Sequence, residues 1–93
     1  MIVKRRRPAS HPLASLTEGE RGWLLKAYAL ALASDSWAGY AGDEEDTGVG
    51  VQLYESGHID VLVFRQGRLG EALTLDPQQG RWVSEQAHRA WKA

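Results

Sequence analysis

A broad band of apolar positions in residues 18–33 predicts the first helix of the chain. Its apolar side chains cover most of the helical circumference and leave only a narrow polar side. Thr17, followed three residues later by Glu20, fits a capping box, and Leu16 stands where a hydrophobic staple would pack. A helix this broadly apolar needs cover on more than one side, from a sheet, from another helix or from a second copy of the chain.

Beyond residue 48 the apolar positions alternate with a period of two, which is typical of β-strands. Turns that contain Gly57 and Gly67 separate three such stretches, namely residues 49–54, 59–64 and 69–75. Residues 81–83 allow a short fourth strand. The pattern therefore predicts a three- to four-stranded antiparallel meander.

The remaining segments are predicted as loops and as a second helix. Residues 34–48 are rich in glycine and serine, so we expect them to end the first helix and form a long loop. The Asp-Pro-Gln-Gln-Gly sequence of residues 76–80 favours a chain reversal, because Pro presets φ and Gly accepts a positive φ. A short C-terminal helix is expected to begin at Ser84 and to carry Trp91 on its apolar face. The expected fold class is α+β, in the order N-terminal helix, meander, short C-terminal helix.

The distribution of charge divides the chain into an arm and a body. The 93 residues carry 11 Lys and Arg and 12 Asp and Glu, a formal net charge of −1. Four of the bases stand together near the N-terminus, where the first 12 residues contain no acid: Lys4, Arg5, Arg6 and Arg7. We therefore expect residues 1–15 to form a flexible basic N-terminal arm and residues 16–93 to form a single α+β domain.

The composition excludes several classes of protein. The chain has no cysteine, which excludes a disulfide scaffold, a thiol nucleophile, a cysteine zinc site and an iron–sulfur cluster. Its apolar runs are shorter than the roughly 20 residues of a membrane span. No apolar stretch follows the N-terminal bases as it would in a secretory signal. The sequence therefore predicts a cytoplasmic protein without a membrane partner.

Motifs for catalysis and metal binding are missing from the sequence. It contains no Gly-x-Ser-x-Gly elbow, no phosphate loop and no dinucleotide fingerprint. His58 and Asp60 share a strand face, but two ligands do not make a zinc site. The acidic run fails as a calcium loop because Tyr54 stands where a bidentate Glu is required. The sequence predicts no enzyme activity, no cofactor and no metal, with a small hydrolase or isomerase built on His58 as the weakest alternative.

An aromatic and acidic segment is the first candidate for a binding site. It combines two rings with four carboxylates: Trp37, Tyr40, Asp43, Glu44, Glu45 and Asp46. Aromatic anchors beside acids suit a protein partner with a basic surface. In the alternative interpretation the rings fold back onto the first helix and the acids form an ordinary solvated loop.

The leading hypothesis is a small non-enzymatic macromolecule-binding domain. Within that class the sequence favours a protein-binding regulator or inhibitor of a larger complex, of the kind that phages and mobile elements encode. The alternative is a nucleic-acid-binding protein. Its basic arm (Lys4, Arg5, Arg6 and Arg7) would contact the phosphates, and its body would serve as a dimeric platform. A homodimer is also expected, since the apolar first helix and an unpaired strand edge both offer a surface to a second copy.

Overall fold

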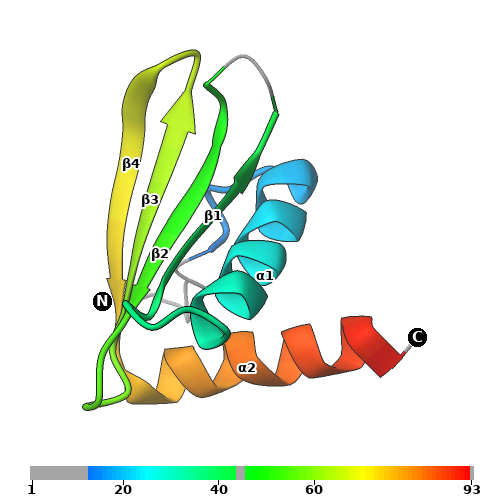
Figure 1. The fold of residues 1–93 in the computed structure, drawn as a ribbon. Helices are drawn as coiled ribbons and strands as arrows, with labels where there is room; N and C mark the ends of the chain where they lie inside the picture. Colours follow the sequence, from blue (N-terminus) through cyan, green and yellow to red (C-terminus); the bar gives the residue numbers. More distant parts are fainter. Residues whose placement is uncertain (1–12, 44–45, 93) are drawn as a thin grey trace, which may run out of the picture.

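One helix precedes and one helix follows a four-stranded antiparallel sheet (Figure 1). The computed structural model describes residues 13–43 and 46–92. The elements are α1 (Glu18–Leu32), β1 (Ala38–Gly42), β2 (Gly48–Leu53), β3 (Ile59–Arg65), β4 (Arg68–Leu75) and α2 (Pro77–Lys92). The strands lie in chain order across the sheet, each antiparallel to the next. The predicted α+β fold, with a meander between two helices, is confirmed.

Helix α1 begins at the capping box that the sequence predicts. The Glu20 backbone N–H donates to Oγ1 of Thr17 at 3.1 Å, and the Thr17 N–H donates to Oε1 of Glu20 at 2.9 Å. Leu16, directly before the cap, is 2% exposed. These contacts satisfy backbone donors that would otherwise be left open at the first turn, and they fix where the helix starts.

The core lies between α1 and one face of the sheet, which we call the inner face. Helix α1 runs along β1 and β2 on this face (Figure 1). Its residues Leu24, Ala27 and Ala31 meet alternate strand residues, and these are Ala41, Val49, Val51, Ile59, Val61, Val63 and Leu75. The core also includes Leu13, which is 1% exposed and lies within the stretch that the sequence assigns to the arm.

Strand β1 lies where the sequence predicts only a loop. The expectation of a long loop over residues 34–48 is therefore wrong for Ala38–Gly42, which pairs with β2 from Ala38 opposite Gln52 to Gly42 opposite Gly48. The strand has no β-branched residue, so local propensity did not reveal it. Its pairing with β2 and its close contact with α1 stabilise it instead.

Helix α2 begins at Pro77 with Asp76 as its cap, whereas the sequence predicts the cap at Ser84. Residues 76–80 do not form a reversal between strands, and residues 81–83 are helical, so the optional fourth strand at that place is also wrong. Asp76 caps the helix: its Oδ1 accepts from the Gln79 N–H at 2.9 Å, and Gln79 Oε1 accepts from the Asp76 N–H at 2.9 Å. Pro77 occupies the first helical position, where its missing N–H costs nothing.

We expect Gly22→Ala to stabilise the fold. Gly22 is exposed in the middle of α1, and a Cβ at this position would have no neighbour within 4 Å. Alanine removes backbone freedom from the unfolded chain, which is worth about 1 kcal/mol and raises the melting temperature by about 5 °C. Thermal unfolding followed by circular dichroism measures the shift. Gly57→Ala is the matched control and should lower the melting temperature, because Gly57 has a φ of 94°; equal shifts in both variants would contradict the argument.

Candidate functional site

Six of the seven large apolar side chains that remain exposed in the described part of the chain fall into two groups. The seven are Leu30, Leu32, Trp37, Tyr40, Tyr54, Leu62 and Leu69. Three of them lie on the sheet face away from α1, three line a groove at the end of α1, and Leu30 lies on α1 itself. Exposed apolar patches mark interaction sites, so both groups are candidates.

The first group belongs to the face of the sheet opposite α1, which we call the outer sheet face. Its paired positions form three rows across the strands: Ala38, Gln52, Asp60 and Thr74; Tyr40, Gly50, Leu62 and Ala72; Gly42, Gly48, Phe64 and Leu69. Asp60 is the only charged residue among these positions. Neither helix packs on this face (Figure 1). The second and third rows therefore present an apolar strip to solvent.

Tyr40 lies across the strip instead of folding back onto α1. Its ring centroid is 6.3 Å from that of Phe64, with the planes tilted by 56°. Glycine at position 48 makes room for the ring, since a Cβ there would lie 2.6 Å from the Tyr40 hydroxyl oxygen. Tyr40 and Phe64 border a shallow hollow of about 290 Å³ together with Asp46. The structure thus brings Tyr40 and one of the predicted acidic residues together.

Asp46 and Thr47, directly before β2, are hydrogen-bonded to the turn between β3 and β4. The Gly67 N–H donates to the Asp46 carbonyl oxygen, and the Gln66 N–H donates to Thr47 Oγ1, both at 2.9 Å. Asp43 and Asp46 are exposed at this end of the outer sheet face. Glu44 and Glu45, which the sequence places in the same site, lie outside the described residues.

A second carboxylate borders the opposite end of the outer sheet face. Asp60 accepts from the Tyr54 hydroxyl at 2.8 Å and from the Thr74 hydroxyl at 2.9 Å. The hydrogen bond to the carboxylate raises the pKa of Tyr54 above its usual value. The apolar strip therefore has carboxylates at both ends, and no base stands among its paired positions.

Trp37 does not share this surface with Tyr40 and the acids. Trp37 lies directly before β1, and Asp43 lies directly after the same strand. Six residues of extended chain at about 3.3 Å per residue separate the two by about 20 Å. The sequence predicts one aromatic and acidic site, and the structure divides it between opposite ends of the sheet.

The groove beside Trp37 holds the second group of exposed apolar side chains. It lies where the end of α1, the start of β1, the β2–β3 turn and the first turns of α2 meet, and its volume is about 340 Å³. We call it the Trp37 groove, and its lining residues include Leu32, Trp37, Leu53, Tyr54, His58 and Arg81.

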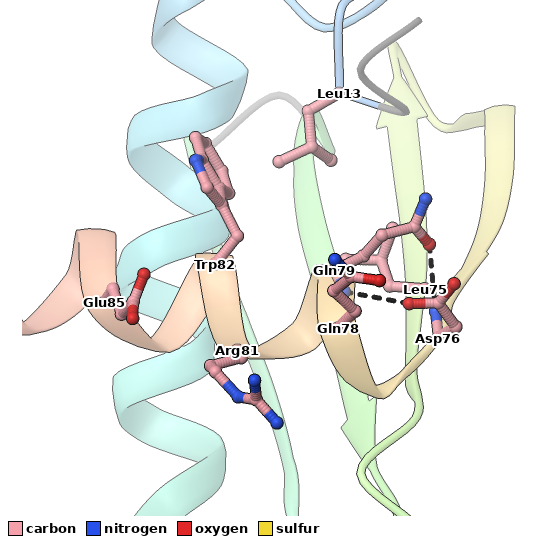
Figure 2. A pocket seen from close by; sticks show the side chains of 8 residues that line it. All are labelled: Leu13, Leu75, Asp76, Gln78, Gln79, Arg81, Trp82 and Glu85. Carbon is pink, nitrogen blue, oxygen red and sulfur yellow. Dashed lines mark hydrogen bonds between the residues drawn. The ribbon is translucent and has the colours of Figure 1, made fainter. Parts of the chain in front are cut away.

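A larger hollow of about 510 Å³ lies between the end of β4 and α2 (Figure 2). Its polar side chains Asp76 and Gln79 are already hydrogen-bonded to each other's backbone at the start of α2. Arg81 and Trp82 point away from one another, Trp82 toward α1 (Figure 2). Because the polar groups of Asp76 and Gln79 already serve the helix cap, we assign the hollow no function.

The most strongly perturbed ionisable groups of the described residues form an ion-pair network that stabilises the fold. Arg65 on the inner face binds Glu20 through Nε at 2.8 Å and Nη2 at 2.9 Å, and it binds Glu71 at 3.2 Å. The hydrogen bond with Arg65 lowers the pKa of Glu20 from 4.5 to about 2, and the same contact raises the pKa of Arg65. This network joins the start of α1 to β3 and β4.

His58, the residue on which the weakest alternative rests, lies at the turn before β3. Its Nδ1 is 2.8 Å from the Ser56 hydroxyl, and it lines the Trp37 groove. The neighbouring carboxylate of Asp60 is hydrogen-bonded to Tyr54 and Thr74 instead. Within residues 13–43 and 46–92, no three His, Asp or Glu side chains are grouped so that they could hold a metal ion.

Sequence reasoning missed the residues at the centre of the outer sheet face. Leu62 and Phe64 occupy the positions of β3 that alternate with the core residues Val61 and Val63. In a strand with one solvent-facing side these positions are usually polar. Large apolar residues on both sides of β3 were the sequence signal that the second face of the sheet is also buried or binds a partner.

The basic arm was the second candidate for a binding site. Lys4, Arg5, Arg6 and Arg7 lie outside the described residues. Among the helices that the structure describes, none has the length and apolar character needed to cross a membrane. Comparison of the chain with protein-family models, with curated proteins and with solved structures gave no match in any of the three.

Proposed function

We propose that the chain is a small non-enzymatic protein-binding domain whose outer sheet face docks on a basic protein surface. The observation that carries the proposal is the apolar strip of Tyr40, Leu62, Phe64 and Leu69, which no described helix covers and which carboxylates border at both ends. Apolar anchors supply binding energy, and the acids steer a basic partner and hold it in register.

The same charges favour a different protein over a second copy of this chain. A two-fold pairing of outer sheet faces would bring the carboxylate-bordered ends of both copies together, and like charges at an interface cost free energy. The homodimer remains a proposal for other surfaces, such as the edges of β1 and β4. On the outer sheet face the complementary partner is a protein with an apolar patch surrounded by Lys and Arg.

The size of the face fits a reversible, regulatory contact. Four strands about 4.8 Å apart and about 20 Å long present roughly 400 Å², whereas a standard stable interface buries about 800 Å² on each partner. The exposed residues Asp43 and Asp46 extend the contact beyond the sheet. A domain of this size acts by occupying a partner's surface, which supports the proposed role as a regulator or inhibitor of a larger complex.

Leu62→Asp is expected to abolish partner binding without loss of the fold. Leu62 is 39% exposed at the centre of the outer sheet face, so a carboxylate there is tolerated in the free protein but not against an apolar anchor site. The tagged full chain is used to capture proteins from its host, and any captured protein is purified and titrated by calorimetry. We expect binding about 100-fold weaker with Leu62→Asp and a steep loss of affinity with salt.

Leu30→Asp is the matched control, since Leu30 is 46% exposed on α1. It should bind as the wild-type chain does, and circular dichroism should show both variants folded. Equal affinity of Leu62→Asp and the wild-type chain would contradict the proposal. Loss of binding on replacing Lys4, Arg5, Arg6 and Arg7 by Ala, with nucleic acid as the captured partner, would support the nucleic-acid alternative in its place.

A further inference from the structure

The Trp37 groove has the features of a second binding site, distinct from the outer sheet face. Three large apolar side chains converge on it while remaining about half exposed: Leu32 at 53%, Trp37 at 40% and Tyr54 at 46%. They come from the end of α1, the start of β1 and the β2–β3 turn. Side chains from three separate elements form a concave apolar surface, the usual shape of an anchor pocket.

The backbone of Trp37 is held in an unfavourable conformation at the groove. Its φ is 57°, a region that bulky residues rarely adopt. The Trp37 N–H donates to the Ser34 carbonyl at 3.1 Å, and the Trp37 carbonyl accepts from the Leu53 N–H at 2.8 Å and from Gln52 Nε2 at 3.2 Å. A backbone that is already held in place loses little conformational entropy when the residue binds a ligand.

The charged and polar groups that line the groove can all donate hydrogen bonds, and none is a carboxylate. Arg81 and His58 line it, and Arg81 makes no ion pair within the described part of the chain. Three carboxylates lie near the lining residues without lining the groove: Asp60, which accepts from the Tyr54 hydroxyl at 2.8 Å, and Asp35 and Glu55 in neighbouring turns. An exposed guanidinium beside an apolar pocket is complementary to a carboxylate next to an apolar group.

We propose that the Trp37 groove binds a protein segment that presents a bulky apolar side chain next to a carboxylate. A groove of about 340 Å³ holds one large side chain, and Arg81 then meets the adjacent acid. The basic arm of this chain is a poor occupant, because it would place its cations beside Arg81. A nucleic acid is also disfavoured, since a backbone of successive phosphates needs several fixed cations and the groove offers one arginine and one histidine.

Two short peptides test this assignment on the full chain by nuclear magnetic resonance. The first is an acetylated and amidated Glu-Glu-Phe-Glu-Glu peptide, and the second replaces every Glu by Lys. The acidic peptide should shift the amide signals of Trp37, Tyr54 and Arg81 and bind about tenfold more tightly than the basic peptide, which corresponds to one charge-assisted contact.

Arg81→Glu should reverse this preference, and Trp37→Ala should weaken both peptides about tenfold. Arg68→Glu is the matched control, since it reverses an exposed arginine at the β3–β4 turn, and it should leave both affinities unchanged. Equal binding of the two peptides, shifts confined to other surfaces, or no reversal with Arg81→Glu would overturn the proposal. Tighter binding of oligothymidine than of the acidic peptide at the same residues would overturn it in favour of a nucleic-acid site. None of these outcomes depends on Leu62, so the groove and the outer sheet face are tested separately.

Discussion

Gly39→Ala is expected to lower the free energy of unfolding by about 3 kcal/mol and the melting temperature by about 15 °C. Gly39 is on the inner face of β1, where a Cβ would collide with the Ala27 carbonyl oxygen and lie 2.7 Å from the Ala31 nitrogen. Both are backbone atoms of α1 and cannot rotate away. The added methyl group therefore has to push the helix off the strand, which opens the core on both sides of the contact.

Gly50→Ala is the control for a glycine in the same sheet without this contact. A Cβ at Gly50 faces the outer side, where its nearest neighbour is a ring carbon of Tyr40 at 3.6 Å, an ordinary contact. The variant should melt within a few degrees of the wild-type chain. Thermal and urea unfolding of the three proteins provide the comparison, and similar stability of Gly39→Ala and the wild-type chain would show that α1 does not approach β1 so closely.

Glu20→Gln is expected to cost about 2 kcal/mol at neutral pH, because it removes the carboxylate that Arg65 binds through two nitrogens. Glu20 is 5% exposed, and the shift of its pKa from 4.5 to about 2 would by itself imply about 3 kcal/mol. The lower figure allows for the solvent around the Arg65 side chain, which is 41% exposed.

The effect of Glu20 should depend on pH in a defined direction. Its pKa is lower in the folded chain than in the unfolded chain, so its contribution is complete above pH 4.5 and is lost as the pH falls toward 2. The difference in melting temperature between Glu20→Gln and the wild-type chain should therefore shrink over this interval. Glu71→Gln, which removes the longer and more exposed contact of Arg65, should cost less than 1 kcal/mol. A difference for Glu20→Gln that stays constant from pH 6 to pH 2.5 would contradict this account.

Local patterns predicted the parts of the fold that local interactions stabilise. Helix α1 was predictable because Thr17 and Glu20 cap it and its apolar band is continuous, and β2 to β4 were predictable from their alternation. Strand β1 was not, because four of its five residues in Ala-Gly-Tyr-Ala-Gly are Ala or Gly, which are poor strand formers, and the strand depends on contact with α1. The start of α2 was missed because Asp76 and Pro77 suit both a reversal and a helix cap, and only the contact with Gln79 distinguishes the two.

The candidate site likewise depends on contacts between distant parts of the chain, which local sequence patterns do not predict. Trp37 and Tyr40 are close in sequence, but the left-handed backbone at Trp37 and the extended strand after it direct them to separate surfaces. The pairing of Tyr40 with Phe64 crosses from β1 to β3 over the glycines of β2. Neither the spacing of residues nor their type reveals such a register before the strands are aligned.

The order of the strands also bears on how the chain reaches this structure. Each strand pairs with the next one along the chain, through turns of only a few residues, so most of the sheet closes short loops at low entropic cost. The contact between α2 and α1 joins parts of the chain that are far apart in sequence. Val83 and Ala87 of α2 are buried. A ribosome delivering this sequence would release α2 after the sheet, so the hydrophobic surface beneath the helix stays open until α2 has left the ribosome.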